Sequence, residues 1–248
     1  MPQDGGQVQD GLTASLGRFA ARLRFEDLPS AAVERAKANM LDAVGCMLAG
    51  AHTADAAPVR ATVAADGGAA QALLFGTRLR LPPAAAALAN GAAGHALDYD
   101  DSSPPMIGHP SVPLIAASFA LAEREGRSGA DCIAAYVAGL EASARLGRHM
   151  NPSHYAAGWH ATATLGTLAA TVGSANLLRL DARGARMAVG IGASTAAGIR
   201  RNFGSAVKPL HAGLAARNGV LAATLAANGL IAADDALDGE RGFVHVFG

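Results

Sequence analysis

Alanine and glycine dominate this chain, even inside the segments whose periodicity is helical. Hydrophobic residues make up 51% of the 248 positions, yet aromatic residues make up only 4%, and there are 30 glycines. Helices with small side chains on their contact faces can bring their backbones close together. The chain is also long enough to bury a substantial core. These features predict a compact helical bundle. A solenoid is not expected, because the sequence contains no repeat of fixed period.

Apolar positions recur at three- and four-residue spacing through most of the chain, which predicts a mainly α fold. One such face runs the length of residues 31–51, with Ser30 as the predicted N-cap. Helices are predicted over residues 12–25, 31–51, 54–65, 82–97, 112–125, 129–146, 160–178, 182–197 and 210–230. Residues 71–75 predict a short extended segment. We expect a disordered tail over residues 1–10 and one helical domain over residues 11–248.

Charge, cysteine content and hydropathy exclude several classes of protein. Basic and acidic residues both number 20, so the net charge is zero and a nucleic-acid partner is not expected. Two cysteines, Cys46 and Cys132, are too few for a disulfide framework or a zinc quartet and predict a reducing cytoplasm. The start of the chain lacks the basic and apolar regions of a signal peptide. Residues 161–178 are long enough to cross a membrane, but their four threonines favour a buried helix of a soluble protein.

The densest polar cluster begins where an apolar helical pattern ends. It places His95, Asp98, Asp100 and Asp101 within seven residues, and His109 follows in a proline-rich stretch. His95 and Asp98 are three apart, so we expect them to share a helix face. Three aspartates at a helix C-terminus oppose the helix dipole, and such misfits often mark functional sites. The alternative is a solvated helix end followed by a turn.

A second cluster covers residues 151–164 and contains the single tryptophan, Trp159, next to His160. His160 stands at the predicted start of a long apolar helix. The dipole at a helix N-terminus disfavours a protonated imidazole, so His160 is expected to stay neutral and able to accept a proton. The alternative is a histidine that merely caps the helix.

The third cluster, Gly198–Pro209, combines Arg200 and Arg201 with Lys208 just before a predicted helix. Of 20 basic residues in the chain only two are lysines, the other being Lys37. Cationic side chains and free backbone N–H groups at a helix start suit a carboxylate or phosphate. Lysine can also lose its proton when buried, which arginine cannot. The alternative is an ordinary basic loop.

Common catalytic motifs for dinucleotides, nucleoside triphosphates and zinc hydrolysis do not occur. Asp100-Asp101-Ser102-Ser103-Pro104 partly matches the aspartate-rich magnesium motif of helical prenyl-diphosphate enzymes. Its fifth position is Pro104 rather than aspartate, and the other acidic pair, Asp234-Asp235, is poorly placed. A magnesium-dependent prenyl-diphosphate enzyme is therefore the weaker alternative.

At the three clusters the sequence resembles the MmgE/PrpD family, which includes 2-methylcitrate dehydratases, cis-aconitate decarboxylases and related epimerases. The matching segments are residues 34–50, 90–117, 158–170 and 208–213, and the similarity runs from about residue 10 to the end. The resemblance implies a large all-helical domain, a homodimer and no metal or organic cofactor. It also implies lyase-type chemistry on small di- or tricarboxylates, in which a proton moves at a carbon next to a carboxylate.

The resemblance also implies which residues act in catalysis. Matched by motif, the active-site positions are Asp98, Ser102, His109, His160 and Lys208. His160 or His109 would serve as base and acid, with the assignment left open. Asp98 would hold one imidazole in a fixed tautomer, and Lys208 would stabilise negative charge that develops on the substrate.

Ser102 and two further residues, Arg200 and Arg201, are expected to bind the substrate. Ser102 stands where family members often carry threonine, and its hydroxyl would donate to a substrate carboxylate. Arg200 or Arg201 would assist the lysine in neutralising charge.

Family chains are nearly twice as long and carry a smaller α+β lid domain that adds active-site residues. This chain ends about where such a lid would begin, so the lid is expected to be absent and catalytic competence is open. The alternative from another class is a non-catalytic helical module, kept for dimerisation or for binding a carboxylate.

Overall fold

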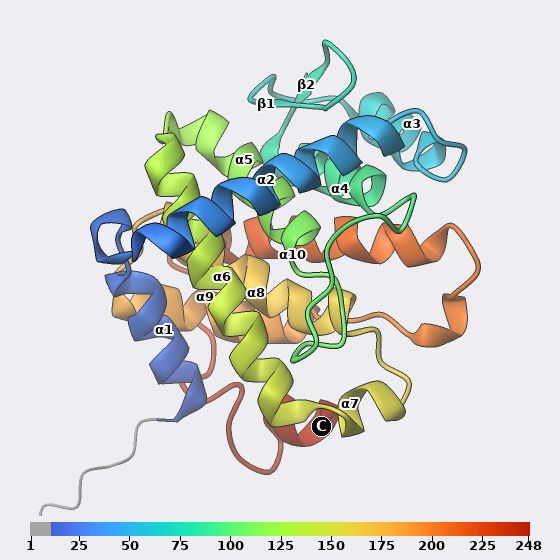
Figure 1. The fold of residues 1–248 in the computed structure, drawn as a ribbon. Coiled ribbons are helices and arrows are strands. Elements are labelled where there is room, and N and C mark those ends of the chain that lie inside the picture. Colours follow the sequence, from blue (N-terminus) through green and yellow to red (C-terminus); the bar gives the residue numbers. More distant parts are fainter. Residues whose placement is uncertain (1–10) are drawn as a thin grey trace, which may run out of the picture.

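The computed structural model describes residues 11–248, and the predicted disordered tail, residues 1–10, lies outside the described residues. Over the described part the chain forms eleven α-helices, two short 3₁₀-helices and one two-stranded antiparallel sheet (Figure 1). The expected mainly α fold is confirmed. The elements are α1 (Leu12–Arg22), η1 (Phe25–Asp27), α2 (Ser30–Gly50), α3 (Ala57–Asp66), β1 (Ala72–Leu73), β2 (Arg80–Leu81), α4 (Pro83–Gly94), α5 (Ser111–Glu125), α6 (Gly129–Met150), α7 (Ser153–Ala156), α8 (Ala161–Leu177), α9 (Ala182–Thr195), η2 (Arg200–Asn202), α10 (Val207–Ala227) and α11 (Phe243–Phe247).

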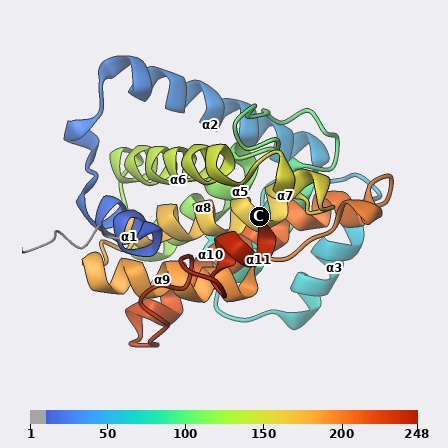
Figure 2. The same ribbon diagram turned by 90° about the horizontal axis from the view of Figure 1, so that it is seen from below.

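Helix α8 is the central element of the bundle. Seen from below, α2, α6 and α8 lie in successive layers, and α9 and α10 pack against α8 (Figure 2). All 17 residues of α8 are buried, including its four threonines. Two of these, Thr167 and Thr171, donate their hydroxyl hydrogens to carbonyls one turn back, at 2.7 and 2.8 Å. Because the hydroxyls are satisfied within the helix, a threonine-rich helix can be buried at little cost.

The buried helix expected at this position is therefore confirmed. None of the helices in the described part of the chain is long and apolar enough to span a membrane. Cys46 and Cys132 are both buried and are free thiols in the described structure.

Glycine allows α4 and α10 to pack backbone against backbone. A Cβ atom added to Gly91 of α4 would lie 2.8 Å from the Cα atom of Gly213 on α10. One added to Gly213 would overlap the carbonyl oxygen of Leu88. This close approach confirms the role expected for small residues. It also fixes the C-terminal end of α4, where the first polar cluster begins, next to the first turns of α10, where the third polar cluster ends.

The predicted N-cap of α2 is wrong. Pro29 occupies the cap position, and Ser30 is the first helical residue with no side-chain cap bond in the described structure. The Pro29 carbonyl accepts hydrogen bonds from the N–H groups of Ala32 and Val33, at 2.9 and 3.1 Å. A proline with ψ of 144° just before the helix directs the chain into it without a serine cap.

Two short helices, α7 and α11, were not predicted. Helix α11 buries Phe243 and stacks it on Phe247, with ring centroids 4.4 Å apart. Phe247 in turn lies 4.5 Å from the ring of Trp159. The apolar residues near Gly248 therefore pack onto the same domain, beside α7 (Figure 1).

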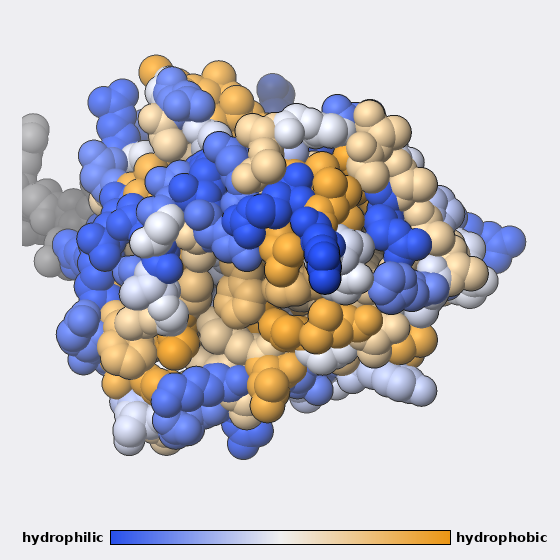
Figure 3. All heavy atoms as spheres, turned by 90° about the horizontal axis from the view of Figure 1, so that it is seen from above, coloured by the Kyte–Doolittle hydropathy of each residue, from blue (hydrophilic) through white to orange (hydrophobic). Residues whose placement is uncertain are grey.

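The surface remains partly apolar. On the face seen from above, apolar and hydrophilic side chains are interspersed, and hydrophilic ones also lie near the middle (Figure 3). Leu41 and Leu48 on the outer side of α2 are 76% and 48% exposed.

Candidate active site

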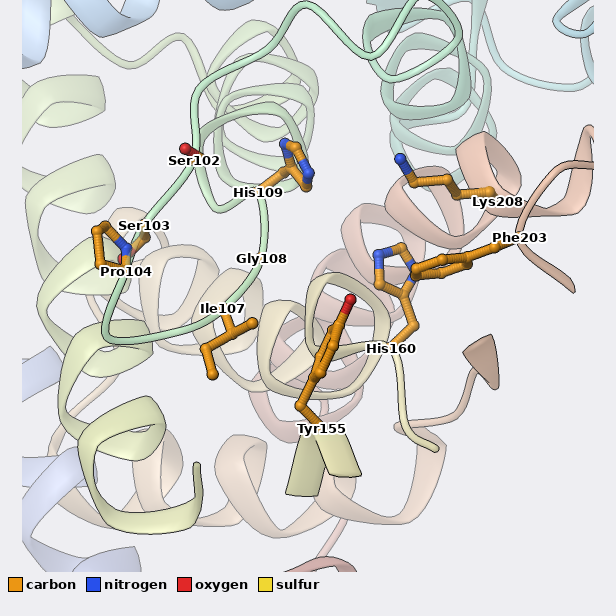
Figure 4. Close-up of a pocket in the computed structure, with 10 residues that line it drawn as sticks. All are labelled: Ser102, Ser103, Pro104, Ile107, Gly108, His109, Tyr155, His160, Phe203 and Lys208. Carbon is orange, nitrogen blue, oxygen red and sulfur yellow. The ribbon is translucent and has the colours of Figure 1, made fainter. Parts of the chain in front are cut away.

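The three polar clusters meet at one cavity of about 320 Å³ (Figure 4). The loop between α4 and α5 forms one wall, α7 and the start of α8 form the floor, and η2 with the first turn of α10 forms the opposite wall. The cavity is lined by Ser102, Ser103, Pro104, Ile107, Gly108, His109, Tyr155, His160, Phe203 and Lys208. His109 and Lys208 face each other from opposite sides, and the Tyr155 hydroxyl points up between them (Figure 4).

His95 and Asp98 do not share a helix face, so that prediction is wrong. Helix α4 ends at Gly94, and His95 is its C-cap. Asp98 has a φ of 56°, the left-handed conformation that aspartate tolerates better than most residues. The chain therefore turns away from the helix axis at Asp98. The two side chains still approach each other, with Asp98 Oδ1 3.9 Å from His95 Nδ1.

Lys208 pairs with Asp98 at the open side of the cavity. Its ammonium donates to Asp98 Oδ1 at 2.6 Å, and the lysine side chain is 19% exposed. Burial raises the pKa of Asp98, but the hydrogen bond and charge of Lys208 outweigh it, so the pKa is lowered overall. One of the two lysines in the chain therefore carries its charge into the cavity.

Asp100 binds His95 behind the cavity wall. Its carboxylate oxygens lie 2.8 and 3.1 Å from His95 Nδ1, and both side chains are fully buried. The other ring nitrogen, His95 Nε2, is buried without a hydrogen-bond partner among the described residues. Asp100 belongs to the predicted polar cluster, but the residue predicted to hold an imidazole is Asp98, two positions earlier.

Asp101 has a structural partner instead. Its carboxylate accepts from the backbone N–H of Ser111 at 3.1 Å and from the Ser111 hydroxyl at 2.6 Å, at the start of α5. Burial raises the pKa of Asp101, and the hydrogen bonds from Ser111 offset part of this effect. Asp100 and Asp101 thus serve different partners and do not present a joint magnesium-binding face, which counts against the prenyl-diphosphate alternative.

His160 is the N-cap residue of α8 and is 2% exposed. Its Nδ1 lies 3.0 Å from Nδ1 of His211, a residue on the first turns of α10. Burial is the main cause that lowers the pKa of His160 to about 2, followed by the nearby His211, His95 and Lys208. The lowered pKa agrees with the neutral imidazole predicted at this position, with burial as the largest cause of the shift.

His109 stands on the cavity wall that is formed by the loop between α4 and α5. Its backbone N–H donates to Thr162 Oγ1 at 3.0 Å, which ties the loop to the start of α8. Its Nε2 lies 3.8 Å from Asp98 Oδ1, and its Nδ1 lies 3.8 Å from Asp100 Oδ2. His109 is thus flanked by two carboxylates, whereas His160 has a second histidine for a partner.

The predicted binding arginines do not reach the cavity. The Arg200 guanidinium lies 3.7 Å from the centre of the Tyr155 ring and donates to the Tyr155 carbonyl at 2.9 Å. Arg201 is exposed on η2. Within the described chain neither residue lines the cavity, whereas Ser102 does. Arg200 instead supports Tyr155, which forms part of the floor.

Sequence reasoning missed several residues of the site. His211 follows Lys208 by three positions on one helix, and this spacing could have indicated that both reach the same region. Tyr155 and Phe203 carried no such signal. The Phe203 ring packs edge-on against His160, with centroids 4.8 Å apart, and so adds an apolar wall beside the imidazole.

Two histidines and two aspartates near the cavity carry atoms that could bind a metal ion. Suitable atoms of His95, Asp98, Asp100 and His109 all lie within 4.8 Å of one another. The Lys208 ammonium already neutralises Asp98, so a metal ion there would compete with a positive charge supplied by the chain itself.

The fold and the cavity together define a helical domain with a small pocket that combines two histidines with one lysine. The chain belongs to the MmgE/PrpD family: the family model for the MmgE/PrpD N-terminal domain matches residues 14–248. The resemblance inferred from the three clusters is confirmed.

Curated relatives point in the same direction. A protein named cis-aconitate decarboxylase from Aspergillus terreus is 33% identical over 97% of this chain and 51% of its own length. The protein of that name from Homo sapiens is 36% identical over 66% of this chain and 35% of its own length. The Mus musculus protein is 30% identical over 94% of this chain and 49% of its own length. The chain spans about half the length of the relatives that it matches in full.

Proposed function

We propose that this chain is a lyase-type domain that acts on small di- or tricarboxylates by transferring a proton at a carbon next to a carboxylate. The observation that carries the proposal is the convergence of His109, His160 and Lys208 on one cavity. Each comes from a different cluster of the sequence, and together they supply a cation and two proton carriers. The cavity of about 320 Å³ suits a small molecule.

The cavity is suited to a carboxylate because the residues that line it include an ammonium and hydroxyl groups but no carboxylate within the described structure. Lys208 supplies the ammonium, and Ser102 and Tyr155 supply hydroxyl groups on two sides. An ammonium ion and hydroxyl donors bind carboxylate oxygens with charge-assisted hydrogen bonds. Phe203 limits water at the His160 side, which strengthens these interactions.

The surroundings of the two cavity histidines suggest different roles. His109 lies between Asp98 and Asp100, which would stabilise positive charge on its ring, so we assign it the general acid. His160 is kept neutral, and with Nδ1 directed at His211 its Nε2 is left for the substrate. We assign His160 the general base.

Among possible substrates, cis-aconitate is the first to test because the relatives named above are cis-aconitate decarboxylases. In a decarboxylation the bond from carbon to the leaving carboxylate breaks and its electron pair stays with the carbon framework. Carbon dioxide leaves, and a proton is delivered to carbon. His109 would deliver that proton, and Lys208 would stabilise the negative charge that builds up before its delivery.

Proton NMR in deuterated water tests this function directly. The purified chain would be incubated in turn with cis-aconitate, citrate and 2-methylcitrate, with Lys208→Ala as the matched variant. We expect one compound to be consumed, with deuterium in the product, and we expect Lys208→Ala to abolish the reaction. Turnover that is unchanged in Lys208→Ala would contradict the site assignment, and absence of both turnover and binding across the panel would contradict the function.

The second candidate is a carboxylate-binding module without catalysis. It is favoured by the lining of the cavity, where Lys208, Ser102 and Tyr155 can hold a carboxylate without any transfer of a proton. Such a module would show a thermal shift with cis-aconitate while the ligand stays unchanged. The homodimer implied by the family resemblance and the cytoplasmic location stay predictions. Size-exclusion chromatography with light scattering tests the first.

A further inference from the structure

Asp100 contacts two histidines at once from a position behind the cavity wall. Its side chain has no exposed surface, and one carboxylate oxygen lies 2.8 Å from His95 Nδ1. The other oxygen is 3.8 Å from His109 Nδ1. The backbone carbonyl of Asp100 also lies 3.4 Å from His109 Nδ1. No other carboxylate in the described structure combines this burial with contacts to two imidazoles.

The hydrogen bond to Asp100 fixes the tautomer of His95. An ionised carboxylate only accepts hydrogen bonds, so the hydrogen of the 2.8 Å contact belongs on Nδ1 of the imidazole. Nε2 then carries a lone pair when the ring is neutral. This atom is buried without a protein partner in the described chain. Leaving a buried polar atom unpaired is unfavourable, so its presence here points to a functional role.

The position of the His95 ring connects it to both cavity histidines. Its centre lies 4.7 Å from the centre of the His109 ring and 6.0 Å from that of His160. It stacks nearly parallel to His160, with 26° between the planes. Any change in the orientation or charge of His95 therefore acts on both residues to which we assign proton transfer.

We propose that His95 and Asp100 form a buried orienting pair, in which Asp100 holds His95 as the Nδ1–H tautomer and the pair positions His109 for proton transfer. His95 and Asp100 are positioning residues, because neither lines the cavity within the described structure. The inference rests on the proposed function, since it concerns the same site. It assigns a role to His95 and Asp100, for which the family resemblance described above implied none.

The neighbouring aspartate provides a matched control. Asp101 is adjacent in sequence and also partly enclosed, but it binds the N–H and hydroxyl of Ser111 rather than a histidine. Asp100→Asn and Asp101→Asn remove the same charge from adjacent positions with almost no change in volume. Only Asp100→Asn changes the partner of His95, because one of the two oxygens that lie 2.8 and 3.1 Å from Nδ1 becomes an NH2 group, which donates and opposes a hydrogen on Nδ1.

The experiment has two arms on the full chain. Long-range proton–nitrogen NMR of the ligand-free protein at neutral pH reports which ring nitrogen of His95 carries hydrogen. Assignment of the signal comes from a His95→Gln variant. We expect the Nδ1–H tautomer in the wild type and in Asp101→Asn, and its loss in Asp100→Asn. The second arm measures turnover of cis-aconitate, where Asp100→Asn should lower kcat by about 10- to 100-fold with KM little changed.

Two results would overturn the inference. One is a His95 ring that keeps the Nδ1–H tautomer in Asp100→Asn, and the other is an equal loss of kcat in Asp101→Asn and Asp100→Asn at unchanged folding. The NMR arm needs no turnover. Failure of the proposed function, seen as intact cis-aconitate with the wild type, is therefore distinguishable from failure of the orienting pair, which the tautomer alone decides.

Discussion

His95 and His160 are both buried near the same cavity, but their partners differ in charge. His95 donates to the carboxylate of Asp100, whereas His160 shares a 3.0 Å contact with a second imidazole, His211. A carboxylate stabilises a protonated ring and fixes its hydrogen on one nitrogen. A second imidazole does neither, and the pKa of His160 is lowered to about 2, with burial as the largest cause and His211 next. The residue type is the same on both sides, so the role is set by the neighbours.

The comparison also separates two regions of the cavity. The loop after α4 supplies carboxylates, from Asp98 and Asp100, while the starts of α8 and α10 supply imidazoles and the single ammonium. Helices α4 and α10 touch through Gly91 and Gly213, so the two regions are held at a fixed separation. A ligand bound between the two regions would meet His109, flanked by carboxylates, on one side, and His160 with the Lys208 ammonium on the other.

The largest expected effect comes from removing the cation that joins the two regions. Lys208→Ala should lower kcat/KM for cis-aconitate by about 10²- to 10³-fold, because it removes a charge-stabilising donor from the cavity. Lys37→Ala is the control, since Lys37 pairs with Glu34 on the exposed side of α2. Turnover measured by NMR checks both. Equal activity of the two variants would remove the basis for treating Lys208 as part of the site.

The next prediction tests the contact between α4 and α10, which sets the separation of the two regions of the cavity. Gly213→Ala places a methyl group onto the carbonyl of Leu88, so we expect the free energy of unfolding to fall by about 1–3 kcal/mol. Gly45→Ala, on the exposed side of α2, meets nothing within 4 Å in the described structure and should raise it by about 0.5–1 kcal/mol. Urea denaturation of both variants measures the difference. A Gly213→Ala protein as stable as the wild type would mean that α4 and α10 do not hold the site rigidly.

A smaller effect concerns the buried histidines and the dependence of the protein's stability on pH. Burial lowers the pKa of His160, His211 and His154 in the folded state. Between about pH 6.5 and pH 5 the unfolded chain therefore binds protons that the folded chain does not, and stability falls as pH falls. Each such histidine contributes up to about 1.4 kcal/mol per pH unit.

Replacing one of these histidines sharpens the test. His211→Asn retains a polar group near His160 Nδ1 and removes one titrating ring, so the loss of stability on acidification should be less steep than in the wild type. Denaturation midpoints at several pH values supply the slopes. A slope that is the same in both proteins would show that His211 does not stay neutral in the folded state.

The smallest expected effect is that of a chelator. Lys208 already neutralises Asp98, so cis-aconitate binding should not depend on a divalent ion. The thermal shift induced by cis-aconitate should be the same with and without EDTA. A shift that EDTA abolishes would instead assign a metal to His95, Asp98, Asp100 and His109, whose donor atoms are close enough to hold one.

Much of the fold and part of the site followed from the sequence. Helical periodicity located the long helices, and the abundance of alanine and glycine correctly indicated close backbone packing, as at Gly213. Helix ends were less certain, because a cap depends on local backbone angles, as Pro29 and Ser30 illustrate. The short α11 was missed because five residues are too few to display a helical period.

The site shows the same division. His109, His160 and Lys208 were predicted and line one cavity, because each lies next to a loop that the helices bring together. That Asp100 rather than Asp98 forms the short contact with His95 could not be predicted, since it depends on the left-handed backbone at Asp98. The predicted arginines failed to reach the cavity for a similar reason: Arg200 is directed onto Tyr155 by the turn of η2.

A crystal structure of the chain soaked or grown with cis-aconitate tests the central claim most directly. The account predicts the ligand in the cavity, with one carboxylate within hydrogen-bond distance of Lys208 Nζ and the reacting carbon between His109 and His160. A ligand bound elsewhere, or an empty cavity at saturating concentration, would contradict the claim that these three clusters form a carboxylate site.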